Sequence, residues 1–259
     1  MVFGLVGGVA FGEVKVELAG LQVTAKGYVP EGENEFNSLR AFNRQLGTKV
    51  GLLVTSSDKA IVKLDEEKSK VTVFSDDQET DLIKVKGRFG RKSVVFRMTS
   101  EAKDGKAIIT HVESSGVPKK GAKNLTLKGD LVLSLASKAR EVRSELTVLK
   151  KGEKLVVGED AFEINSLGKP DWGDDPIQVE LKSSVSYKDF KGFHFYDSEG
   201  NKVESNRSGS GSMGLFGKRT YTVSFNLKKK VDKIVLAVDE WSDLEVVKVP
   251  FDFTIRAGL

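Results

Sequence analysis

Side chains suited to acid–base catalysis are scarce in this chain, which holds two histidines and no cysteine. A serine or water nucleophile activated by histidine would depend on His111 or His194. The sequence contains neither a G-x-S-x-G nucleophile turn nor an H-E-x-x-H zinc motif. His194 alternates with Phe193 and Phe195, so we expect it to point away from a core that the phenylalanines enter. We assign no catalytic residue and expect a protein that is not an enzyme.

Acidic turns offer two other kinds of chemistry. Paired carboxylates could hydrolyse a glycosidic bond, but nothing in the sequence places two of them across a cleft. Calcium takes about six to eight oxygen ligands, and the segments Ser75–Asp81 and Asp197–Asn201 are rich in oxygens. Neither fits the ligand spacing of an EF-hand loop, and aspartate commonly bonds its own turn, so we prefer hydrogen-bonded turns. The candidate ligands for calcium, the one cofactor considered, are Asp76, Asp77, Glu79, Asp81, Asp197 and Glu199.

Trp172 is the candidate contact for a ligand. It lies in the segment Lys169–Pro176, whose proline, glycine and aspartate residues predict an exposed loop. An indole ring at the surface can stack on a sugar, so a glycan is a candidate partner. The alternative is a buried anchor that holds this loop against the rest of its domain.

A basic run between Lys84 and Lys92 contains Phe89 and could contact phosphates while the aromatic ring stacks on a base. Lys84, Lys86 and Arg88 also alternate as expected for the solvent face of an edge strand, where lysines discourage aggregation. The net charge of +4 agrees with this second interpretation. We therefore expect no nucleic-acid partner.

The N-terminal segment Met1–Gly12 carries no charged side chain. A membrane-spanning helix needs about 20 apolar residues, so this segment is too short to cross a bilayer. Its length suits the apolar part of a signal peptide, although the basic start is missing, and it could be the remnant of one. It could also form the first strand of its own domain, or a strand donated to a neighbouring subunit. The residues of this predicted assembly strand are Val2, Phe3, Leu5, Val6, Val9 and Phe11.

Strand-like runs with alternating apolar residues, separated by Gly, Asp, Asn and Ser, follow one another along the chain. They predict an all-β protein of two tandem Ig-like β-sandwich domains, residues 13–138 and 139–259, after the apolar segment 1–12. Two segments break the pattern. Glu35–Leu46 has the apolar period of a short helix, and Ser205–Gly217 is rich in Gly and Ser, which predicts a flexible loop.

Three pairs of similar segments support the tandem arrangement. The members of each pair share their alternation of apolar residues and occur in the same order, so we interpret them as equivalent strands of the two domains. The pairs are Leu127–Leu135 with Val247–Ile255, Val71–Phe74 with Phe193–Phe195, and Arg91–Met98 with Lys218–Phe225.

These observations predict a non-enzymatic structural or interaction protein of the cell surface or of an extracellular assembly. The N-terminal segment would mediate self-association into a homo-oligomer or a filament, because head-to-tail contacts need not close into a ring. The alternative is an adhesin-like module that binds a ligand or a glycan through Trp172.

Overall fold

The computed structural model describes residues 9–11, 14–25, 27, 31, 46–84, 94–215 and 218–257. Among these residues the regular structure is antiparallel β-sheet, and the one helical element is a 3-10 turn at Tyr187–Asp189. The all-β prediction is therefore confirmed. The predicted helix lies outside the described residues apart from Leu46, and so does most of the basic run. In the described part of the chain no helix is long and apolar enough to cross a bilayer.

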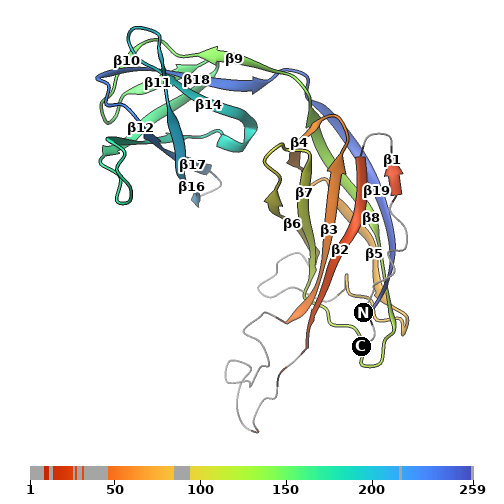
Figure 1. Ribbon diagram of the computed structural model, residues 1–259. Coiled ribbons are helices and arrows are strands. Elements are labelled where there is room, and N and C mark those ends of the chain that lie inside the picture. Colours follow the sequence, from red (N-terminus) through yellow and green to blue (C-terminus); the bar gives the residue numbers. More distant parts are fainter. Residues whose placement is uncertain are drawn as a thin grey trace. The chain divides into compact units, whose positions relative to one another are not determined.

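The first of two compact units comprises Met1–Leu135 and Glu245–Leu259. One of its sheets has the strand order β1-β2-β3-β7-β6 (Figure 1). In its other sheet β8 lies between β19 and β4, and β5 also pairs with β8. The strands are β1 (Val9–Phe11), β2 (Val14–Thr24), β3 (Gly47–Ser56), β4 (Ala60–Leu64), β5 (Lys70–Asp76), β6 (Val94–Glu101), β7 (Ala107–Ser114), β8 (Asn124–Ala136) and β19 (Glu245–Arg256).

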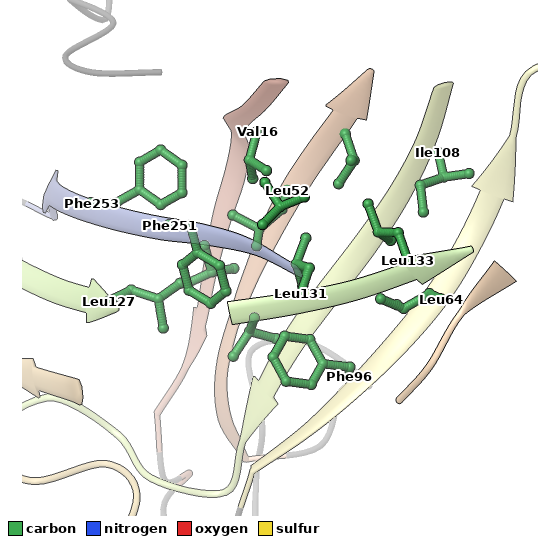
Figure 2. Close-up of a cluster of buried hydrophobic side chains, with 14 of the residues drawn as sticks. Val16, Leu52, Leu64, Phe96, Ile108, Leu127, Leu131, Leu133, Phe251 and Phe253 are labelled. Atoms are coloured by element: carbon green, nitrogen blue, oxygen red, sulfur yellow. The ribbon is translucent and has the colours of Figure 1, made fainter. Parts of the chain in front are cut away.

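Side chains from both sheets of this unit enter one hydrophobic core. In β8 every second residue from Leu125 to Leu135 is buried, as the alternation of its sequence predicts. Figure 2 shows Leu52 of β3 and Phe251 of β19 among the side chains of this core. Because two sheets bury their inner faces against each other, the unit has sandwich-like character.

Strand β19 lies in a different unit from the one that its sequence suggested. We expected Val247–Ile255 to close a second domain, 139–259, whereas β19 pairs along its whole length with β8 of the first unit. Leu127, for example, lies opposite Phe253. Directly opposed residues of an antiparallel pair point to the same face, so two paired strands on one core share their alternation. The two segments therefore resemble each other as paired strands of one sheet.

The second unit comprises Ala136–Leu244 and has its own hydrophobic core. One sheet has the order β11-β12-β13-β17-β16, and the other has the order β10-β18-β14-β15, with β9 also paired to β18. The strands are β9 (Ala139–Arg143), β10 (Thr147–Val148), β11 (Lys154–Val157), β12 (Asp160–Gly168), β13 (Ile177–Ser183), β14 (Phe190–Tyr196), β15 (Lys202–Val203), β16 (Ser205–Leu215), β17 (Lys218–Leu227) and β18 (Lys233–Trp241).

The strand orders of the two units correspond. The row β2-β3-β7-β6 matches β12-β13-β17-β16, and the row β5-β8-β19 matches β14-β18-β9. The expected equivalence of Val71–Phe74 in β5 with Phe193–Phe195 in β14 fits this correspondence. The expected equivalence of Arg91–Met98 with Lys218–Phe225 does not fit it, because β6 takes the position of β16 and not of β17.

The loop predicted at Ser205–Gly217 is wrong over the described residues, because Ser205–Leu215 forms strand β16. This strand pairs antiparallel with β17, from Ser205 opposite Leu227 to Leu215 opposite Lys218. Its small polar residues suit the edge of a sheet. There the backbone groups on one side of the strand are paired, and water can hydrogen-bond to those on the other side. Composition alone predicts flexibility, whereas pairing with β17 stabilises this segment as a strand.

Candidate functional site

The first acidic turn is closed by the carboxylate of Asp76. Its Oδ1 accepts hydrogen bonds from the backbone N–H groups of Gln78 and Thr80 at 2.9 and 2.8 Å. Its Oδ2 accepts a hydrogen bond from the backbone N–H of Lys119 at 2.7 Å. Burial raises the pKa of Asp76, but these hydrogen bonds outweigh burial and hold the pKa below its usual value. Both oxygens are thus engaged by backbone donors.

The other predicted ligands of this turn have similar roles. The side chain of Asp77, in the same turn, accepts hydrogen bonds from backbone N–H groups, including that of Lys123 at 3.1 Å. Asp81 forms an ion pair with Lys84 at 3.0 Å, and the hydrogen bond from this lysine is the main reason that the pKa of Asp81 is lowered. The side chain of Glu79 is exposed. The turn is therefore a network of carboxylates and N–H donors.

The second acidic turn has the same pattern in the second unit. Asp197 Oδ1 accepts hydrogen bonds from the backbone N–H groups of Glu199 and Asn201 at 3.0 and 2.9 Å. Lys229 Nζ donates to Oδ2 at 3.0 Å and, with these backbone groups, lowers the pKa of Asp197 to about 2. Glu199 accepts a hydrogen bond from the Asn201 side chain at 3.1 Å. A calcium ion at either turn would compete with these donors.

The correspondence of the turns yields a prediction for Glu79, whose φ of 64° is positive where Gly200 has a φ of 82°. A left-handed conformation costs a residue with a Cβ about 1–2 kcal/mol, while glycine loses about 0.5–1 kcal/mol in backbone entropy. We expect Glu79→Gly to raise the free energy of unfolding by about 0.5–1 kcal/mol, measured by chemical denaturation. The matched change Gly200→Ala should lower it, and a neutral result for both would contradict the strain argument.

Trp172 is 87% exposed, in the loop between β12 and β13. The alternative of a buried anchor is therefore not the arrangement observed. Trp241, at the end of β18, is partly buried, and Lys191 Nζ lies 5.6 Å from its ring centroid. Trp172 thus presents an indole face to solvent, as a surface contact for a ligand requires.

Of the residues predicted to form the assembly strand, Val9 and Phe11 belong to β1. They pair antiparallel with β2 of their own unit, with Val9 opposite Val16 and Phe11 opposite Val14. This placement corresponds to the alternative in which the segment begins its own domain. The remaining residues, Val2, Phe3, Leu5 and Val6, lie outside the described residues.

A polar cluster that the sequence did not reveal lies on one sheet of the second unit. Strands β9, β18 and β14 are neighbours, and Asp239 of β18 lies opposite both Glu141 of β9 and Gly192 of β14. His194 is two residues from Gly192, so its side chain points to the same face. The neighbouring Phe195 is fully buried on the other face, as the alternation predicts. We refer to Glu141, His194 and Asp239 as the His194 cluster.

The three side chains of the His194 cluster approach one another closely. His194 Nε2 lies 2.9 Å from Asp239 Oδ2. One nitrogen or oxygen atom from each of the three residues lies within 4.8 Å of the other two. The side chains of His194 and Asp239 are 25% and 26% exposed, so the cluster is accessible to solvent and small ions.

Glu141 is fixed by two donors next to the cluster. Tyr196 donates its hydroxyl to Oε2 at 2.8 Å, and Arg143 Nε donates to Oε1 at 2.6 Å. The Arg143 guanidinium also lies 4.1 Å from the centroid of the Tyr196 ring. Burial raises the pKa of Glu141, but the bonds from Arg143 and Tyr196 outweigh it and lower the pKa. Glu141 is therefore held as an oriented carboxylate.

Gly192 lies directly beside the two closest atoms of the cluster. A Cβ atom at this position would lie 2.8 Å from Asp239 Oδ2 and 3.4 Å from His194 Nε2. A side chain there would crowd the two atoms that form the shortest contact of the cluster. Glycine at this position therefore allows Asp239 and His194 to approach each other.

The residue types of the cluster are those of a general base and of a metal site. A histidine oriented by a carboxylate can act as a general base if a hydroxyl or water lies beside it. Within the described residues, the hydrogen bond of His194 is to Asp239 and no hydroxyl bonds to its ring. One imidazole and two carboxylates are, however, donors that divalent transition metals accept.

The comparisons with known proteins show no family. No protein-family model matches the chain, and no curated protein matches it. One solved structure, described as the crystal structure of the conserved domain protein from Bacillus anthracis, shares 9% sequence identity with this chain. The match covers 96% of this chain and 89% of that chain at a TM-score of 0.24, which carries no argument about fold or function.

Proposed function

We propose that this is a non-enzymatic structural or interaction protein, built from two Ig-like β-sandwich units and self-associating through its N-terminal strand. The supporting observation is the edge of the sheet at β2. Strand β1 covers Val14–Val16 of β2, and in the described part of the chain no strand pairs with the same edge along Glu17–Thr24. An exposed row of backbone N–H and C=O groups can accept a further strand.

The pairing of β1 indicates the direction in which a further strand would fit this edge. Because β1 lies antiparallel on β2, with Val9 opposite Val16, a strand that adds to the unpaired part of a second copy's β2 could run in the same direction as β1. The uncharged residues Val2, Phe3, Leu5 and Val6 precede Val9. When they add to the β2 edge of a second copy, each molecule donates one strand and accepts another. This head-to-tail contact gives a filament unless a rotation closes it.

We place the protein at the cell surface or in an extracellular assembly. Sandwich modules of this kind are common in cell-surface proteins. The support here is the pair of units with corresponding strand orders, each with a core shared by its sheets.

The test is the mass of the full chain compared with a variant lacking residues 1–8, which retains β1. We expect light scattering to show oligomers or polymers for the full chain and a folded monomer for the shortened one. Val156→Lys removes an apolar side chain that is 55% exposed on the second unit, and it should assemble like the full chain. Equal masses for the full and shortened chains would overturn the proposal.

The exposure of Trp172 favours a second function, an adhesin-like module for a ligand or a glycan. Exposed indoles of this kind serve as stacking surfaces, and neither unit needs this side chain for its core. The same scattering experiment separates the two functions. A binding module should be a folded monomer with or without residues 1–8.

A further inference from the structure

We propose that the His194 cluster is a binding site for a divalent transition metal ion, with Zn²⁺ as the ion that its donors fit. The site is formed by Glu141, His194 and Asp239 on three adjacent strands of one sheet. Because sheet strands hold their side chains in fixed positions, the donors are brought together before an ion arrives. The proposal goes beyond the self-association proposed above and does not depend on it.

The donor atoms and their spacing support this assignment. Zinc binds imidazole nitrogen and carboxylate oxygen at about 2.0–2.2 Å, so two ligands of a tetrahedral ion lie about 3.4 Å apart. His194 Nε2 and Asp239 Oδ2 are 2.9 Å apart and need to separate only slightly. Glu141 supplies an oxygen within 4.8 Å of both. Water would complete the coordination on the exposed side.

The charges around the cluster also favour a cation. Two carboxylates face a histidine that binds metal in its neutral form. Arg143 is paired with Glu141 through Nε at 2.6 Å, so Asp239 is the carboxylate whose charge a divalent ion would chiefly neutralise. The hydrogen bond between His194 and Asp239 would be exchanged for two metal–ligand bonds.

Two residues outside the ligand set support the site. Tyr196 and Arg143 orient Glu141 in the way that outer hydrogen bonds orient metal ligands. At Gly192 a Cβ atom would lie 2.8 Å from Asp239 Oδ2 and 3.4 Å from His194 Nε2, so a side chain there would push these two donor atoms away. The glycine therefore permits the close approach of the two donors that the site requires.

The test is a calorimetric titration of the metal-free full chain with ZnCl₂. We expect one equivalent to bind, and we expect His194→Gln to abolish that binding. The matched control is His111→Gln, because His111 is the other histidine of the chain and lies on β7 of the first unit. It should leave the titration unchanged. Tyr196→Phe, which removes a positioning residue, should weaken binding by about tenfold or more.

A second readout keeps the result clear if a histidine variant folds poorly. In proton NMR spectra, Zn²⁺ should shift the ring signals of His194 and leave those of His111 in place. Glu141→Gln changes an exposed side chain and should also lose binding without loss of fold. The proposal is wrong if wild-type protein takes up no Zn²⁺, or if Glu141→Gln and His194→Gln bind it as wild type does.

Discussion

Replacing Phe251 with alanine is expected to unfold the first unit while the second unit stays folded. Phe251 is 2% exposed, stacks on Phe253 at 6.2 Å and packs edge to face with Phe96 at 6.5 Å. Removing a buried phenylalanine costs about 3–5 kcal/mol through lost burial and the cavity left behind. Because a domain of ordinary stability has about 5–15 kcal/mol, this change removes much of what holds the first unit together.

The chain carries its own probes for this experiment. Both tryptophans, Trp172 and Trp241, belong to the second unit, so their fluorescence reports on that unit, whereas circular dichroism reports on both. We expect denaturant to produce an early transition by circular dichroism and an unchanged one by fluorescence. Thr254→Ala, an exposed change on the same strand, should alter neither. If both signals move together for Phe251→Ala, β19 does not belong to the first unit alone.

The existence of many strands could be predicted because it depends on local pattern. The alternating segments Leu127–Leu135 and Val247–Ile255 predict strands, and they lie within β8 and β19. In β8, the apolar residues at every second position are the buried ones. A period of two is visible within one segment and needs no knowledge of the rest of the chain.

Strand pairing could not be predicted in the same way, because it joins residues far apart in sequence. The phase shared by β8 and β19 is compatible with equivalent strands in two domains and with paired strands in one. The structure shows the second case, and β19 takes in the first unit the position that β9 takes in the second. In sequence, β9 precedes the other strands of the second unit, whereas β19 follows the other strands of the first unit. A division of the chain into two continuous halves misses this arrangement.

The same limit explains why the His194 cluster was missed. The direction of the His194 side chain, away from the core, could be predicted from its phenylalanine neighbours. Its partners come from two other strands, and their proximity depends on the register that sets Asp239 opposite Glu141 and Gly192. The metal ligands predicted from the sequence are acidic residues in turns. Those carboxylates bond mainly to the backbone near them.

Gly129 gives the second large expected effect, since its replacement by alanine should separate β5 from β8. A Cβ atom at this position would overlap the carbonyl oxygen of Lys70 and lie 2.7 Å from Cζ of Phe251. The carbonyl belongs to the backbone of β5, which is bulged between Val71 and Val73, so it cannot rotate away as a side chain could. Overpacking of this kind costs about 1–3 kcal/mol or more. We expect a loss of about 3 kcal/mol in the first unit, measured by circular dichroism in denaturant.

Gly20→Ala is the matched control for this change. Gly20 also lies in a strand of the first unit, but a Cβ there would meet nothing within 4 Å, and its φ is not in the left-handed region. Because glycine within a strand is less stable than alanine by about 0.5–1 kcal/mol, this control should be neutral or stabilising. Close approach of two strands, rather than loss of a glycine as such, then accounts for the difference. Equal effects at Gly129 and Gly20 would mean that β5 and β8 do not approach each other as closely as the structure shows.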